Sequence, residues 1–197
     1  MIRAVFGGSF DPVHDGHVAM AGHILQHGLA ARVIVIPNRR SPWRGEPLAS
    51  AVDRLAMCRL AFAALPEVSV DDRELAGNGP RYTVDTLATL AQEHPGDRFR
   101  LVIGADHLAT FNRWHEPGRL LSLAELIVLD RAGLATDPAA VARAGLPPDR
   151  VIIAPPFSHP VSASAVRAML AAGEPTGALL PPPVSAYIAA HRLYRVA

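Results

Sequence analysis

The fold is decided by the stretch Val5-Phe6-Gly7-Gly8-Ser9-Phe10-Asp11-Pro12-Val13-His14-Asp15-Gly16-His17 near the N-terminus. Residues 2–6 form a short apolar run, which predicts a strand buried on both faces. Gly7 and Gly8 let the backbone turn tightly after it and approach a ligand without a Cβ in the way. A helix that starts near Gly16 would turn its free N–H groups and its positive dipole end toward the same space. The stretch therefore predicts an anion site between a strand and a helix, suited to a nucleotide phosphate.

Two histidines three residues apart, His14 and His17, lie in and just after the predicted turn, where they can donate hydrogen bonds to a phosphate. The alternative is a glycine turn with two solvated histidines. A zinc site is disfavoured because structural zinc takes four ligands, often sulfur. The one cysteine, Cys58, falls within the apolar pattern of a predicted helix, which indicates a buried thiol. We therefore predict no metal held by the protein itself.

The composition fits one domain over residues 1–197, with a C-terminal helical segment at about 180–197. Hydrophobic residues make up 50% of the chain, and one cysteine excludes an intrachain disulfide. No apolar run could cross a bilayer, and the N-terminus enters a strand rather than a signal peptide, which predicts a cytoplasmic protein with no membrane partner. The net charge of +1 argues against a nucleic-acid partner. All 19 basic residues are arginines, so a charged phosphate contact outside histidine must be an arginine fork.

Strand-like runs alternate with helical patterns along the chain. The strand candidates are residues 2–6, 33–36, 68–70, 99–103, 126–129 and 151–153. Helical spacing or composition marks residues 18–26, 51–64, 84–93 and 137–144. This order predicts an α/β fold, a doubly wound and mostly parallel sheet with helices on both faces. Right-handed crossovers would place the ligand loops at the carboxyl ends of the strands.

A proline-bounded loop after the second predicted strand, residues 37–45, carries Arg39, Arg40 and Arg44 together with Trp43. Three arginines and an aromatic ring suit an electropositive flap over a phosphorylated ligand, in which the ring could cover a base. A solvated basic loop is the alternative.

Two further segments place polar side chains beside predicted element ends. Thr83, after Tyr82, is placed to cap the helix that follows. Asp106 comes after a buried strand that ends in Gly104, where its carboxylate could accept a ribose hydroxyl or cap a helix. Trp114, by its residue type alone, would belong to the core.

Small hydroxyl residues precede a last predicted helix, which continues through Leu170. Ser162 and Ser164 lie in this segment, and Ser164 is the candidate N-cap. Arg167 follows one turn later, so these side chains can address an anion together at the start of the helix.

The first stretch matches, residue for residue, the pattern G-G-[ST]-F-D-P-x-H-x-G-H. This is the form of the (H/T)xGH signature typical of bacterial nicotinate-mononucleotide adenylyltransferases. Residues 160–167 resemble the second hallmark of that nucleotidyltransferase superfamily, I-S-S-T-x-I-R, with Ala163 for a serine and Ser164 for a threonine. The blocks between them resemble the family's P-P-H-[KR], S-Y-T-x-D-T-L and G-x-D-x-L…W-[HYE] patterns, with Trp43 in place of the histidine. The resemblance covers nearly the whole chain and implies a Rossmann-like fold.

The resemblance also implies site residues for two substrates. For ATP they are Gly7, Gly8, Ser9, Phe10, His14, His17, Gly104, Asp106, Ser162, Ser164 and Arg167. The catalytic residues among them are His14, His17 and Arg167, which would act on the triphosphate. For the mononucleotide they are Ser9, Arg44, Tyr82, Thr83, Trp114 and His115. Trp114 would stack on the nicotinate ring, and backbone N–H groups near Thr83 and His115 would bind its carboxylate.

The activity so implied joins ATP to nicotinate mononucleotide and gives deamido-NAD and pyrophosphate, in NAD biosynthesis, with Mg²⁺ carried on the ATP. Another small-acceptor nucleotidyltransferase is one alternative, acting on nicotinamide mononucleotide or pantetheine phosphate. A nucleotide-sensing module without turnover is another, raised by Trp43 and Ala163. The oligomeric state is open, and a homo-oligomer is compatible with the sequence.

Overall fold

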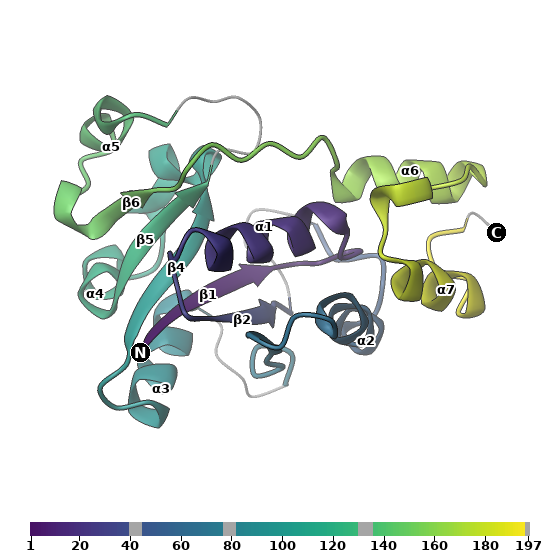
Figure 1. Ribbon diagram of the computed structural model, residues 1–197, viewed down its shortest axis with the longest axis horizontal. Helices are drawn as coiled ribbons and strands as arrows, with labels where there is room; N and C mark the ends of the chain where they lie inside the picture. The colour runs from purple at the N-terminus through teal and green to yellow at the C-terminus, as the bar shows by residue number, and fades with distance from the viewer. Residues whose placement is uncertain (40–44, 77–81, 130–135, 196–197) are drawn as a thin grey trace.

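Six parallel strands form one sheet in the computed structural model, which describes residues 1–39, 45–76, 82–129 and 136–195. The strands are β1 (Ile2–Gly8), β2 (Arg32–Pro37), β3 (Val68–Val70), β4 (Arg98–Gly104), β5 (Ala124–Leu129) and β6 (Val151–Ile153). Their order is β3-β2-β1-β4-β5-β6, and each neighbouring pair is parallel. The chain therefore builds outward from β1 to β3, returns to β4 beside β1, and continues to β6 (Figure 1). Sheets of this order bind ligands at the switch point, between the carboxyl ends of β1 and β4.

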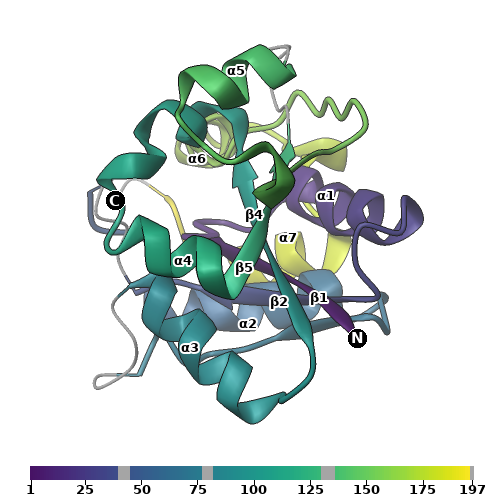
Figure 2. The ribbon, with the colours of Figure 1, turned by 90° about the vertical axis from the view of Figure 1, so that its left-hand side faces the viewer.

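Helices cover both faces of this sheet. They are α1 (Asp15–Gln26), α2 (Ala51–Phe62), α3 (Thr83–Glu93), α4 (Pro117–Leu123), α5 (Pro138–Arg143), α6 (Ala163–Ala172) and α7 (Pro182–Ala190), with 3-10 segments η1 (Ala105–Arg113), η2 (Pro148–Arg150) and η3 (Gly177–Leu179). Successive strand residues point to opposite faces. Ala4 and Phe6 of β1 accordingly share a core cluster with α1, α2, α6 and α7, and Val5 shares the other with α3, α4 and α5. Figures 1 and 2 both show the sheet running between α1 and α3.

Every predicted strand and helix has a counterpart at its place in the chain, and the doubly wound, Rossmann-like sheet is confirmed. The sequence patterns did not predict η1 or α4, which connect β4 to β5. Within the described ranges, no helix is both long enough and apolar enough to cross a membrane.

The predicted starts of two helices were wrong by one or two residues. The N-cap of α3 is Tyr82 rather than Thr83, because the Tyr82 carbonyl already accepts the first helical hydrogen bonds. The N-cap of α6 is Ser162 rather than Ser164, because Ser162 Oγ accepts the N–H of Ala165 at 3.2 Å. Both helices still turn their N-terminal ends toward the carboxyl edge of the sheet.

Candidate functional site

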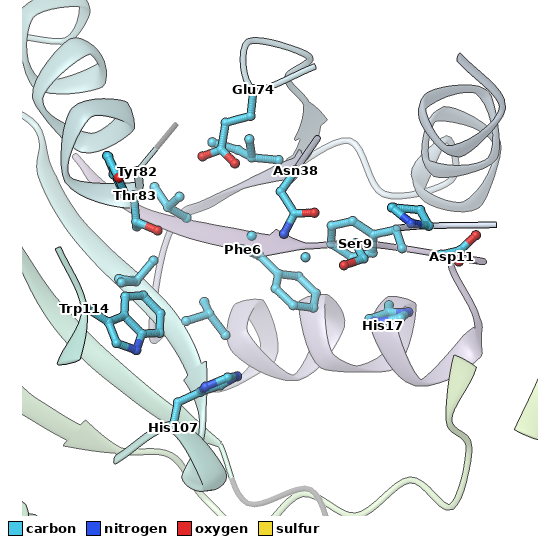
Figure 3. A pocket seen from close by; sticks show the side chains of 18 of the residues that line it. Phe6, Ser9, Asp11, His17, Asn38, Glu74, Tyr82, Thr83, His107 and Trp114 are labelled. Atoms are coloured by element: carbon cyan, nitrogen blue, oxygen red, sulfur yellow. The ribbon is translucent and has the colours of Figure 1, made fainter. Parts of the chain in front are cut away.

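A cavity of about 860 Å³ opens at the carboxyl ends of β1 and β4 (Figure 3). This volume lies within the range of roughly 300–1,000 Å³ that small-molecule and cofactor sites occupy. Segments far apart in the sequence form its walls: the loop after β1, the start of α3, the end of η1 and the start of α6. The fold therefore places the cavity at the switch point of the sheet.

The cavity brings together most of the predicted site residues. Those that line it are Gly7, Gly8, Ser9, Phe10, His17, Tyr82, Thr83, Trp114, His115 and Arg167. Five predicted residues lie outside the lining: His14, Gly104, Asp106, Ser162 and Ser164. All of them except Gly104 adjoin a lining residue in sequence or through a side-chain contact. Arg44 and Trp43 of the predicted basic flap lie outside the described residues.

His17 is held in one orientation at the start of α1, whose N-cap is His14. The backbone N–H of His14 donates to Nδ1 of His17 at 3.2 Å. Because Nδ1 accepts, the ring proton of a neutral His17 sits on Nε2, which can then donate to a ligand. The two imidazole rings stack with centroids 3.7 Å apart, and the buried ring of Phe10 meets His17 edge-on at 4.9 Å. This N–H donor therefore lies where a helix start stabilises an anion.

The loop after β1 departs from ordinary backbone geometry. Phe10 has a φ of 47°, in the left-handed region that residues other than glycine seldom adopt. Such residues cluster at ligand sites, where the surrounding packing holds them in place. Gly16 permits a close approach between the start of α1 and the segment before α6, because a Cβ at Gly16 would lie 2.7 Å from Val161 Cγ1. Two helix starts thereby converge on one end of the cavity.

Arg54 of α2 is a residue of this site that the motifs missed. It is 1% exposed, and its guanidinium donates to the carbonyl oxygens of Ser9 at 2.6 Å, Asn38 at 2.7 Å and Arg39 at 3.3 Å. Burial lowers the pKa of Arg54, and the nearby charge of Asp11 opposes that shift. Arg54 thus connects the loop after β1 to the loop after β2.

We expect Arg54→Lys to lower the free energy of unfolding by about 2 kcal/mol, because one ammonium nitrogen cannot reach all the carbonyls that two guanidinium nitrogens contact, and each lost hydrogen bond costs roughly 1 kcal/mol. Urea unfolding followed by circular dichroism measures this change. Arg59→Lys on the same helix is the control, since Arg59 is exposed and pairs with Asp72 at the surface. Equal stability of the two variants would contradict the tethering role of Arg54.

Arg167 reaches the same end of the cavity from α6. Its Nη1 donates to the carbonyl oxygen of Asp11 at 2.6 Å and lies 3.8 Å from Oδ2 of that residue. In the part of the chain that the structure describes, these contacts occupy one guanidinium nitrogen. The other two nitrogens, Nε and Nη2, can donate a pair of hydrogen bonds to one anion.

Aromatic rings and a helix start form the other end of the cavity. Figure 3 shows Tyr82, Thr83 and Trp114 at the side far from His17. The N-cap of α3, Tyr82, makes no side-chain capping bond, and its ring stacks on His115 with centroids 4.0 Å apart. A helix start beside flat aromatic surface suits an aromatic ring that carries an anion.

Glu74, which lines the cavity, is the second residue of this site that no motif indicated. Its Oε1 accepts the hydroxyl of Thr86, in the first turns of α3, at 2.6 Å. Burial raises the pKa of the Glu74 carboxyl, and the bond from Thr86 opposes that shift. Glu74 therefore fixes the start of α3 against the cavity wall.

Comparison with known proteins places the chain among nucleotidyltransferases. The family model described as cytidylyltransferase-like matches residues 5–169. The probable nicotinate-nucleotide adenylyltransferase of Laribacter hongkongensis is 42% identical over 205 residues, which cover 97% of this chain and 93% of that protein. The protein of the same name from Symbiobacterium thermophilum is 40% identical over 197 residues, covering 97% and 94%.

Solved structures share the fold. Plasmodium falciparum nicotinic acid mononucleotide adenylyltransferase complexed with NaAD superposes with a TM-score of 0.80 at 19% identity, over 98% of this chain and 97% of that one. The same enzyme complexed with APC gives a TM-score of 0.78 at 20% identity, over 98% and 96%. The sheet order and the helix layers are thus those of a known architecture.

Proposed function

Because this chain belongs to the cytidylyltransferase-like family, and within it to the nicotinate-nucleotide adenylyltransferases, we propose that its cavity binds ATP and nicotinate mononucleotide side by side and joins them. The products are deamido-NAD and pyrophosphate, in NAD biosynthesis. One observation supports this assignment above the others: a single cavity contains two separate places for anions. The start of α1 with His17 and Arg167 forms one, and the start of α3 with Trp114 forms the other.

The end of the cavity at α1 would hold ATP. Gly7, Gly8 and Ser9 line this end, and His17 offers Nε2–H to the triphosphate. The buried ring of Phe10 shapes the loop against His17. Five further residues would complete this half from just outside the lining: His14 beside His17 near the triphosphate, Gly104 and Asp106 near the ribose, and Ser162 and Ser164 near the phosphates.

The reaction transfers the adenylyl group directly. A phosphate oxygen of the mononucleotide attacks the α-phosphorus of ATP in line, and the bond from that phosphorus to the β-bridging oxygen breaks. Pyrophosphate then leaves with the electron pair of the broken bond, and no covalent bond to the protein forms. Charge grows on the departing group, where His17 and Arg167 donate hydrogen bonds. The chain therefore acts by positioning and by charge stabilisation.

Mg²⁺ would accompany ATP rather than reside in the protein. Among residues 1–39, 45–76, 82–129 and 136–195, no group of three or more His, Cys, Asp or Glu side chains could hold a metal ion. Mg²⁺ in nucleotide sites is bound mainly by phosphate oxygens and water, and such an ion needs few protein ligands. The ion would then neutralise part of the triphosphate charge.

We expect Arg167→Lys to lower kcat/KM for ATP about tenfold, because lysine keeps the charge but loses the fork. Initial rates of pyrophosphate release at varied ATP measure this effect. Arg143→Lys serves as the control, since Arg143 is exposed on α5 and away from the cavity lining. Full activity of Arg167→Lys with unchanged ATP dependence would reassign Arg167 to a structural role.

Pyrophosphate release by the purified protein tests the function. ATP is supplied with nicotinate mononucleotide, nicotinamide mononucleotide, pantetheine phosphate or no acceptor. We expect release with nicotinate mononucleotide and formation of deamido-NAD in equal amount. Turnover with pantetheine phosphate alone would favour another small-acceptor transferase, and ATP binding without any release would favour a nucleotide-sensing module.

A further inference from the structure

The segment after α7 turns back toward the α1 end of the cavity. Helix α7 ends at Ala190, and Tyr194 lies in the turns that follow, with a φ of 63°. Its hydroxyl donates to Oδ1 of Asp11 at 2.9 Å, although 183 positions separate the two residues. Asp11 belongs to the first motif and lines the cavity. The C-terminal segment thus contacts the loop assigned to ATP.

The Asp11 carboxylate is buried and receives donors on both oxygens. Oδ2 accepts the N–H of Leu48 at 2.9 Å, and Oδ1 accepts the N–H of Ala49 at 3.0 Å besides the Tyr194 hydroxyl. The backbone carbonyl of Asp11 accepts Nη1 of Arg167 at 2.6 Å, whereas Oδ2 stays 3.8 Å from that nitrogen. The carboxylate is therefore held near Arg167 but beyond hydrogen-bond distance.

We propose that Tyr194 is a positioning residue for the triphosphate, an inference that rests on the proposed function. Its hydroxyl holds the Asp11 carboxylate back from Arg167 and so keeps the guanidinium fork available to ATP. Without this hydroxyl, Oδ1 keeps only the N–H of Ala49, and the less restrained carboxylate can rotate so that Oδ2 closes its 3.8 Å gap to Arg167. A direct ion pair between Asp11 and Arg167 would then compete with the phosphates for the same donors.

Tyr194 has the chemistry that this role needs. Burial and the neighbouring charge of Asp11 raise the pKa of Tyr194 far above its usual range, so the hydroxyl remains a neutral donor. A hydrogen bond from a hydroxyl to a carboxylate is charge-assisted and stronger than one between neutral groups. The ring also packs against the core cluster on the α1 face, so phenylalanine at this position removes the donor and retains the packing.

The same segment offers a matched control. Tyr187 of α7 donates to Oδ1 of Asp53 on α2, also at 2.9 Å. Neither residue lines the cavity. Tyr187→Phe therefore removes an equivalent bond and reports the purely structural cost of a loosened C-terminal segment.

Steady-state kinetics of the wild type, Tyr194→Phe and Tyr187→Phe test the proposal, with each substrate varied in turn below the melting temperatures of all three proteins. We expect Tyr194→Phe to raise KM for ATP about five- to tenfold, which is the effect of losing one ordinary hydrogen bond. KM for nicotinate mononucleotide should stay unchanged, and Tyr187→Phe should leave both constants at wild-type values. An unchanged KM for ATP in Tyr194→Phe, or an equal rise for both substrates, would overturn the proposal.

A double variant separates positioning from general loosening. If Tyr194 acts on Arg167 through Asp11, adding Tyr194→Phe to Arg167→Lys should change KM for ATP less than about twofold. If the two substitutions instead raised KM for ATP by independent factors that multiply in the double variant, the proposal would be overturned.

Titration with a non-hydrolysable ATP analogue measures the affinity of the wild type and of Tyr194→Phe for the nucleotide in the absence of an acceptor. Weaker binding by Tyr194→Phe than by the wild type supports the role, and equal affinity defeats it. A wild type that binds the analogue but makes no deamido-NAD would defeat the proposed function instead, so the two failures are distinguishable.

Discussion

His17→Ala is expected to lower turnover about 10²- to 10³-fold while the protein stays folded, because one oriented donor to a developing charge contributes on that order. The bond from the His14 N–H to Nδ1, at 3.2 Å, leaves Nε2 as the nitrogen that carries the proton. In the proposed transfer step this donor would face the triphosphate as pyrophosphate departs. Alanine removes it, and the loss appears in the rate more than in the stability.

Pyrophosphate release at saturating ATP and acceptor measures the effect, and a circular dichroism melt checks that the variant is folded. His27→Ala is the control at the opposite end of α1, where Nδ1 of His27 lies 2.9 Å from the carbonyl oxygen of His23. We expect this control to keep wild-type turnover. Equal turnover of His17→Ala and the wild type would refute the role assigned to the first motif.

The central strands could be predicted because most of their residues are apolar and buried on both faces. Residues 126–129 form an unbroken apolar run, and residues 99–103 are apolar except for Arg100; the two segments lie inside the observed β5 and β4. Helix starts were harder, because several polar residues near a start can each serve as cap. Ser162 and Ser164 are equally good caps by residue type, and the hydrogen bond from the backbone N–H of Ala165 to Oγ of Ser162 identifies Ser162 as the cap.

Site residues that belong to a short sequence motif could be predicted. Site residues whose partners lie far away in the sequence could not. Arg54 did carry a signal, since it shares the buried face of α2 with Met57, Cys58 and Ala61 at helical spacing. An arginine on such a face needs buried acceptors, yet the sequence does not say that these are the loop carbonyls above it. The bond between Asp11 and Tyr194 leaves no local pattern at all, because the fold alone brings the two residues together.

The second large effect is acceptor choice: nicotinate mononucleotide should be preferred over nicotinamide mononucleotide. The two differ by a carboxylate against a neutral amide. In the proposed site the flat face of Trp114 would stack on either ring equally well, so stacking would not distinguish the two acceptors. Discrimination must therefore come from hydrogen-bond donors that face the substituent.

Helix α3 offers such donors. Its N-cap makes no side-chain capping bond, and the Tyr82 carbonyl accepts the N–H groups of Asp85 and Thr86. The N–H groups of Thr83 and Val84 have no acceptor among the residues that the structure describes. They lie at the positive end of the helix dipole, where a carboxylate is stabilised.

A carboxylate can accept hydrogen bonds from both N–H groups. The NH₂ of the amide is itself a donor, so it would leave these N–H groups unpaired, and each unpaired donor costs roughly 1–3 kcal/mol of binding free energy. Two such losses amount to a preference of about 100-fold or more, since each 1.4 kcal/mol is a factor of ten. The measurement is kcat/KM for both mononucleotides under the same conditions. Trp114→Ala is the control: it should weaken both acceptors by the same factor and leave their ratio unchanged. Equal kcat/KM values in the wild type, or a preference for the amide, would mean that the start of α3 does not bind the carboxylate and that the chain acts on nicotinamide mononucleotide.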